Sequence, residues 1–163
     1  WYRFLTSGFI HADWIHLLIN MLVLWSFGNV VERYYAAMFE EKAVFYFILL
    51  YLGGIVIAIT PSYKRHMHNA GYNALGASGA VSAVLFTAIL FRPLDKIYLY
   101  GVIGIPGILL GVAYLAYSYY MDKKGGDFIN HDAHFWGAVY GVLFTILLKP
   151  SVVLHFLDQI TSF

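Results

Sequence analysis

Hydrophobic residues in this chain are gathered into five long runs that short polar stretches separate. The runs lie at residues 14–31, 43–60, 76–91, 106–121 and 132–148. Each is close to the length that a helix needs to cross the hydrocarbon part of a bilayer, and each holds few charged residues. The pattern predicts an all-α fold, a polytopic transmembrane helical bundle, formed by a single domain over residues 1–163.

The polar stretches between the runs predict where the helices end. Residues 32–42 are expected to form a charged, aromatic loop, and residues 62–75 a longer polar loop that begins after Pro61. The fourth helix is expected to begin at Pro106, because proline suits the first position of a helix. Residues 97–105 would then be an extended or interfacial lead-in to that helix.

The two ends of the chain differ from the five runs. Residues 1–13 are amphipathic and rich in aromatic side chains, and the tail after residue 148 is mildly amphipathic, so both are expected to lie at the membrane interface. The chain starts at Trp1 without Met and shows no signal-peptide pattern. We therefore expect it to be a trimmed piece of a longer chain.

Composition narrows the class further. Of the 163 residues, 61% are hydrophobic and 12% are charged, about half the roughly 25% that is usual in soluble domains. Cysteine is absent, which excludes disulfides and thiolate chemistry. The net charge of +1 gives no electrostatic footprint for nucleic acid. Lysine and arginine are shared equally between the two sides of the predicted bundle, so their distribution does not orient it.

Alternation across a membrane brings three polar residues to one level. The first, third and fifth helices must run in the same direction, so their N-terminal ends share one leaflet. These ends carry His16, Ser78 and His134. Ionisable residues within membrane spans are costly and are by default functional.

Ser78 and His134 predict a catalytic pair. Gly76 and Gly79 flank Ser78, so a ligand or a backbone can approach its hydroxyl closely. The N-terminal turn of a helix also offers free N–H groups to an oxyanion. An imidazole can take the proton of a serine hydroxyl, and Asp132, two residues from His134, would point elsewhere, so a dyad is favoured over a triad. The alternative is that this small-residue run only allows close helix packing.

Two further groups support this site. His16 and Asn20 lie four residues apart on one helical face and can both donate to an oxyanion, or else can form interhelical hydrogen bonds. Gly137 and Gly141 form a GxxxG step beside His134, which would let two helix backbones approach.

Other uses of the histidines are metal binding and proton transport. A zinc site needs three or four converging ligands, and the pairs His11 and His16, His66 and His68, and His131 and His134 do not predict one. We expect no metal and no cofactor. A transporter built on His16, Asn20 and His134 would be expected to show an internal repeat, and the chain has none.

Three segments together resemble the rhomboid intramembrane serine proteases: FIHADWIHLLINMLVLWSFGNVVE, GASGAVSAVL and AHFWGAVYG. This resemblance implies that Ser78 is the nucleophile and His134 the general base. It also implies that the oxyanion hole is lined by His16, Asn20 and the Ser78 N–H. Such an enzyme would be a serine-type endopeptidase that cleaves transmembrane segments of membrane-protein substrates.

The resemblance implies further positions. His11 matches a histidine close to the site, Gly28 and Glu32 match a structural GxxxE step, and a loop with Gly125 and Gly126 would cap the site. The expected location is a bacterial inner membrane, with the site toward the extracytoplasmic face. The expected partners are the lipid bilayer and transmembrane substrates, without nucleic acid.

The chain departs from the family pattern in two places. The family core has six helices, and five are expected here, because residues 1–13 match the loop after the first helix. Ser82 stands where the family often has an aromatic side chain that stacks under the catalytic histidine. We hypothesise that the Ser82 hydroxyl orients His134 instead. The alternative function is a catalytically silent rhomboid-like protein that binds or dislocates client helices. The sequence identifies neither the substrate nor the oligomeric state.

Overall fold

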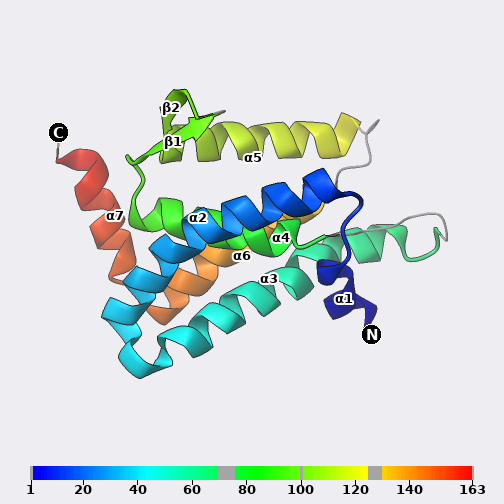
Figure 1. Ribbon diagram of the computed structural model, residues 1–163, viewed down its shortest axis with the longest axis horizontal. Coiled ribbons are helices and arrows are strands. Elements are labelled where there is room, and N and C mark those ends of the chain that lie inside the picture. The colour runs from blue at the N-terminus through cyan, green and yellow to red at the C-terminus, as the bar shows by residue number, and fades with distance from the viewer. Residues whose placement is uncertain (1, 70–75, 100, 125–129, 163) are drawn as a thin grey trace.

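The structure, a computed structural model, describes residues 2–69, 76–99, 101–124 and 130–162. The regular structure of these residues is helical apart from one hairpin, as Figure 1 shows. The elements are α1 (Arg3–Thr6), η1 (Ser7–Phe9), α2 (Trp14–Phe39), η2 (Glu40–Lys42), α3 (Ala43–His66), α4 (Ser78–Phe91), β1 (Lys96–Leu99), β2 (Ile103–Pro106), α5 (Gly107–Lys124), α6 (His131–Leu148) and α7 (Val152–Thr161).

Helix α4 is the centre of the bundle. It packs on α6, α3 and α2, and α5 lies along one further side (Figure 1). Twelve of its 14 residues are buried. At 1.5 Å per residue the helix is about 21 Å long, shorter than the roughly 30 Å of bilayer hydrocarbon. The helix is therefore too short to reach both surfaces of a bilayer.

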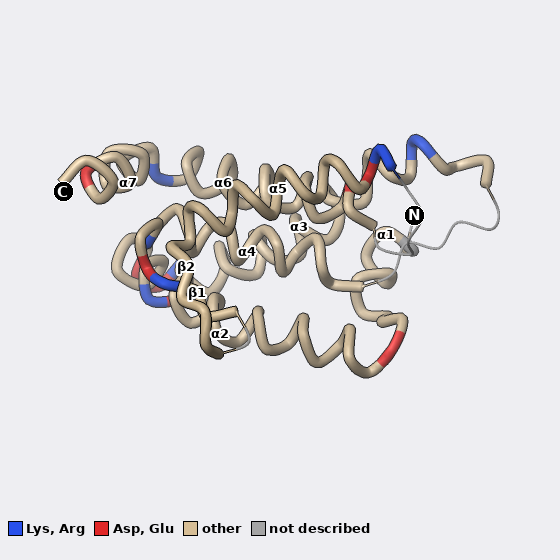
Figure 2. Tube along the Cα trace, turned by 90° about the horizontal axis from the view of Figure 1, so that it is seen from above, with Lys and Arg blue, Asp and Glu red and all other residues tan. Residues whose placement is uncertain are grey.

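Helices α2, α4 and α6 run in the same direction, and their N-terminal ends lie at one end of the bundle (Figure 1). Figure 2 shows that the described Lys, Arg, Asp and Glu residues gather at the two ends of the bundle and leave its middle uncharged. Large apolar side chains are exposed along the middle of the helices, among them Trp25 of α2 with 72% and Ile57 of α3 with 45% of its surface exposed. An outer surface of this kind is what a bilayer would cover.

Helix α2 is longer than the sequence predicts. The expected loop at residues 32–42 is wrong, because the helix continues to Phe39 and only η2 separates it from α3. Val31 and Tyr35 are both fully buried one turn apart, so the core-facing side of the helix extends past residue 31. Glu32 and Arg33 between them are exposed and do not interrupt it.

Helix α3 also passes its expected end. Pro61 lies inside the helix, which continues to His66, so the loop expected from residue 62 is wrong at its start. The helix beyond Pro61 is held by tertiary contacts. The Ser62 hydroxyl is buried and lies 3.0 Å from Asn130 Oδ1 and 3.1 Å from Asp132 Oδ2 on the α6 side. Bundles tolerate an internal proline when neighbouring groups hold the flanking turns in this way.

The connection between α4 and α5 is an antiparallel hairpin in which Lys96 pairs with Pro106 and Leu99 with Ile103. The expected extended lead-in is therefore observed. The expected helix start at Pro106 is wrong by one residue, because Pro106 still pairs with β1 and α5 begins at Gly107. The Gly107 N–H donates to Asp95 O at 2.9 Å, which fixes the start of α5 against the residue that precedes β1.

A chain of buried hydroxyls crosses the bundle core. Tyr35 Oη on α2 lies 2.9 Å from Thr145 Oγ1 on α6, and Thr145 Oγ1 lies 3.3 Å from Thr87 Oγ1 on α4. Thr87 also donates to the Gly141 carbonyl at 3.1 Å. Three helices are thus joined by polar contacts at positions that water does not reach.

By length and mean hydropathy, one helical stretch among the described residues qualifies as able to cross a membrane, and it runs over Trp14–His66, which contains α2, η2 and α3. Helices α6 and α7 meet the same criterion only when taken together, and a bend of 111° separates them. Helix α4 is apolar but shorter. The five individual spans remain predictions from the sequence.

Candidate active site

Ser78 is the first residue of α4, and the chain reaches it through an unusual turn. Gly76 has a φ of +105°, in the region that favours glycine, and Ala77 is the N-cap. The helix start expected at residue 76 is therefore wrong by two residues. The Gly76 N–H donates to the Ser7 carbonyl at 2.9 Å, so the N-terminal segment holds the approach to Ser78.

The imidazole of His16 lies against Gly76. A Cβ atom on Gly76 would be 2.6 Å from His16 Cε1, so space as well as φ requires glycine there. The Asp13 carboxylate caps α2 by accepting from the His16 N–H at 2.7 Å. His16 and Ser78, which are far apart in the sequence, are thus brought close together, because His16 contacts Gly76, two residues before Ser78.

Asn20 lies one turn further along α2 and is buried, with 5% of its surface exposed. Its Nδ2 donates to the His16 carbonyl at 2.7 Å. This bond uses one of the two N–H groups of the amide. It holds the side chain against the turn that carries His16.

Helices α4 and α6 meet backbone to backbone beside Ser78 and His134. A Cβ on Gly137 would overlap the Gly79 carbonyl, and one on Gly141 would overlap the Ala83 carbonyl. A Cβ on Gly79 would lie 3.2 Å from Ala133 O. Gly79 follows Ser78 and Ala133 precedes His134, so the closest approach of the two helices is adjacent to both candidate residues.

His134 is half-buried near the start of α6. This helix begins at His131, one residue earlier than expected, with Asn130 Oδ1 accepting from the Ala133 N–H at 3.0 Å. The His134 ring is stacked on Tyr114 of α5, with 5.9 Å between centroids and 22° between planes. It also meets His131 edge to face at 6.0 Å.

The neighbouring carboxylate is engaged elsewhere. Asp132 accepts from the Ser62 hydroxyl at 3.1 Å and lies 3.5 Å from Arg65 Nη2. Arg65 in turn binds Asp122 near the end of α5 at 2.8 Å. This cluster joins the ends of α3, α5 and α6 next to the site.

Ser82, one turn after Ser78, is buried, and its Oγ lies 3.4 Å from Tyr114 Oη. The sequence motifs did not predict the contact between Tyr114 and His134. The absence of an aromatic side chain at position 82 was the signal that another ring could be present.

His11 completes the group of histidines on the α2 side. Its ring meets that of His16 edge to face at 5.3 Å, and its Nε2 is buried without a hydrogen-bond partner among the described residues. Desolvation, and secondly the charge of His16, lower the pKa of His11, although a hydrogen bond with the Phe9 backbone opposes this.

Other predicted positions lie outside this group. Gly28 is buried on α2, where a Cβ would make an ordinary contact of 3.5 Å with Phe47, and Glu32 is exposed. Gly125 and Gly126 fall outside the described residues. Within the described parts of the chain, no group of three or more His, Asp or Glu side chains is arranged to hold a metal ion.

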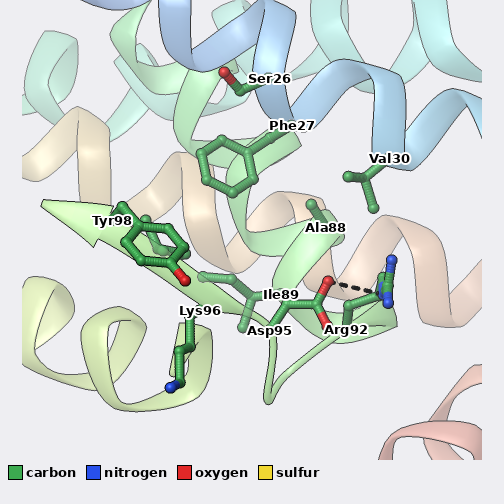
Figure 3. A pocket seen from close by; sticks show the side chains of 10 residues that line it. Ser26, Phe27, Val30, Ala88, Ile89, Arg92, Asp95, Lys96 and Tyr98 are labelled. Carbon is green, nitrogen blue, oxygen red and sulfur yellow. Dashed lines mark ion pairs between the residues drawn. The ribbon is translucent and has the colours of Figure 1, made fainter. Parts of the chain in front are cut away.

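The hollow drawn in Figure 3 is at the opposite end of α4. Its walls come from Phe27 and Val30 on α2 and Ile89 on α4, and its rim carries Arg92, paired with Asp95 at 2.9 Å. Arg92 follows Ser78 by 14 residues, which corresponds to roughly 20 Å along a helix. This hollow is therefore separate from the candidate active site.

The family model of the Rhomboid domain matches residues 1–151. The chain belongs to the rhomboid family. Membership agrees with the resemblance seen in the sequence motifs and confirms the fold class, an all-α membrane bundle.

Named relatives agree with this assignment. "RHOMBOID-like protein 12, mitochondrial" of Arabidopsis thaliana is 30% identical over 85% of this chain and 44% of its own length. "Rhomboid-like protein 11, chloroplastic" of the same plant is 32% identical over 91% of this chain and 53% of its own. "Presenilin-associated rhomboid-like protein A, mitochondrial" of Danio rerio is 32% identical over 83% of this chain and 34% of its own.

This rhomboid chain thus spans between about a third and about half of the length of these curated relatives. Their names place them in mitochondria or chloroplasts, so they give no support to the predicted bacterial inner membrane. No solved structure matches the chain.

Proposed function

We propose that this rhomboid domain is an intramembrane serine endopeptidase that uses Ser78 and His134 as a catalytic dyad. The observation that carries the proposal is the contact of α4 with α6 at Gly79, Ala133 and Gly137, beside both residues. The family assignment supports the same activity class.

In the proposed reaction, the Ser78 hydroxyl attacks the carbonyl carbon of a peptide bond while His134 takes its proton. The C–N bond then breaks, and His134 returns the proton to the leaving amine. Water attacks the resulting ester, His134 again accepts and returns a proton, and Ser78 is regenerated. Asp132 does not take part, because its carboxylate is bound to Ser62 and Arg65.

The oxyanion would be stabilised where α4 begins. The N–H groups of the first helical turn have no acceptor within their own helix, so the Ser78 N–H is available to an oxyanion. His16 lies against Gly76, two residues before Ser78, and Asn20 lies against the turn of His16. These two side chains are the further proposed donors.

The proposed substrates are transmembrane segments of membrane proteins. A backbone in lipid keeps its hydrogen bonds by staying helical, so a bond there is open to attack only after local unwinding. We propose that Ser78 meets such a segment below the extracytoplasmic surface of the membrane, a depth that is compatible with the short length of α4.

A fluorophosphonate probe tests the proposal on the detergent-solubilised protein. We expect labelling at Ser78 that disappears in Ser78→Ala and in His134→Ala, with both variants retaining the thermal unfolding profile of the wild type. His155→Ala is the matched control, because His155 lies on α7 and contacts the Phe91 carbonyl at 3.2 Å. A folded wild type that is not labelled would refute the dyad and favour the client-helix binding function.

A further inference from the structure

We infer that Tyr114 is the positioning residue of His134, and that α5 supplies the aromatic support that α4 lacks at Ser82. This inference rests on the proposed function, since it concerns the orientation of the proposed general base. It assigns a role to a residue that none of the sequence motifs includes.

The two rings have the geometry of an interacting pair. Their centroids are 5.9 Å apart and their planes differ by 22°, within the range in which stacked rings attract one another. A stacked arrangement restricts rotation of the imidazole about its side-chain bonds. The face of a tyrosine ring also favours an imidazolium, the form that His134 takes after it accepts the Ser78 proton.

Tyr114 is itself held from α4. Its hydroxyl lies 3.4 Å from Ser82 Oγ, and its ring lies 6.1 Å from that of Phe86. Gly111, one turn earlier on α5, brings this part of the helix close to α4, because a Cβ there would lie 3.3 Å from Phe86 Cε1. The ring that contacts His134 is therefore fixed by two side chains of the helix that carries Ser78.

A second contact between a tyrosine of α5 and a histidine of α6 lies one helical turn away. Tyr117 meets His131 edge to face, with 5.5 Å between centroids and 82° between planes. Tyr114 and Tyr117 on α5 thus pair in order with His134 and His131 on α6. Two contacts one turn apart fix the rotation of α5 relative to α6 as well as its distance.

The carboxylate nearest to His134 along the chain, Asp132, is held by other residues. In a triad the third member holds the imidazole by a hydrogen bond. Here Asp132 is bound to Ser62 and Arg65 instead. Ring stacking by Tyr114 restricts the orientation of the imidazole through a contact with its face.

The first test measures cleavage of a transmembrane reporter by Tyr114 variants in detergent. Because small displacements of catalytic groups can cost up to a hundredfold, we expect Tyr114→Leu to lower kcat by roughly tenfold to a hundredfold with KM unchanged. Tyr114→Phe keeps the ring and should keep most of the rate. Tyr117→Leu, the matched control one turn away, should reduce kcat far less.

A swap variant separates positioning from general damage. The double variant Ser82→Tyr with Tyr114→Ser returns the ring to α4 and should recover activity relative to Tyr114→Ser alone. Equal losses in Tyr114→Leu and Tyr117→Leu, or a loss in Tyr114→Phe as large as in Tyr114→Leu, would overturn the inference.

A second measurement does not depend on activity. In protein with isotope-labelled histidine, the ring signals of His134 can be assigned by their loss in His134→Gln. Tyr114→Leu should shift these signals by removing the ring current, whereas Tyr114→Phe should leave them near their original position. Unchanged His134 signals in Tyr114→Leu would overturn the inference even in an active enzyme. A shift in a protein without labelling at Ser78 would support the pairing while refuting the proposed dyad.

Discussion

Gly137 on α6 faces the Gly79 carbonyl on α4 so closely that a methyl group does not fit between them. Gly137→Ala should therefore separate the two helices, lower the free energy of unfolding by about 1–3 kcal/mol and reduce probe labelling of Ser78. Thermal unfolding in detergent and labelling rates measure both effects.

Gly28→Ala is the control for that substitution. Its Cβ would make an ordinary contact with Phe47 at 3.5 Å, and alanine is the better helix former. We expect unchanged or slightly increased stability. Equal stability of the Gly137→Ala and Gly28→Ala proteins would show that the contact at Gly79 tolerates a side chain.

His16 tests the proposed oxyanion hole. Loss of one such donor typically costs about 3 kcal/mol of transition-state stabilisation, so His16→Ala should slow cleavage of a reporter about a hundredfold. The rate of reporter cleavage is compared with that of Asn20→Ala and of His155→Ala, which lies away from the site. A rate for His16→Ala that equals the rate for His155→Ala would exclude His16 as a donor.

Thr145 tests the buried hydroxyl chain. Thr145→Val keeps the shape of the side chain but removes its contacts with Tyr35 and Thr87, and should lower the free energy of unfolding by about 0.5–2 kcal/mol. Thr60→Val is the control, because Thr60 donates to Val56 O of its own helix and is not in the core. Unfolding in mixed micelles measures the stability of both variants. Equal losses of unfolding free energy would mean that the interhelical hydrogen bonds of Thr145 do not stabilise the fold.

The lowered pKa of His11 predicts how the stability of the protein depends on pH. The pKa of His11 in the folded protein is below its ordinary value of 6.5, so between the two values the unfolded chain binds more protons than the folded one. Stability should then be highest above pH 6.5 and fall as the pH drops below it. His11→Gln should show a smaller loss between pH 8 and pH 5, and an identical pH dependence would exclude this contribution.

The sequence allowed the site to be proposed because its main residues sit at the ends of well-marked apolar runs. His16, Ser78 and His134 follow from the common direction of three helices, and the glycines near them mark where backbones approach. The observed fold agrees with the run pattern for the same reason, since an apolar run without turn residues has few alternatives to a helix in lipid.

The lengths of α2 and α3 could not be predicted in this way. Charged residues such as Glu32 and Arg33 indicate a loop by composition, but they lie on the exposed side of a helix whose other side holds the buried Tyr35. Pro61 is likewise compatible with a helix once Ser62 is bound by α6. The positions at which α2 and α3 end therefore depend on contacts with residues distant in the sequence.

Tyr114 could not be predicted for a related reason. Fourteen tyrosines are present, and nothing local distinguishes the one that faces His134. Its partner becomes evident only when the rotation of α5 about its own axis is known.

The enclosure of α4 has a consequence for how the membrane acts on this protein. A helix with twelve of its 14 residues buried is not in contact with lipid along most of its length. Changes in acyl-chain length or fluidity therefore act first on α2, α3, α5 and α6, which would tilt or stretch to match the bilayer. Ser78 begins this shielded helix, so the proposed reaction at Ser78 should depend less on lipid composition than the entry of a substrate between the outer helices does.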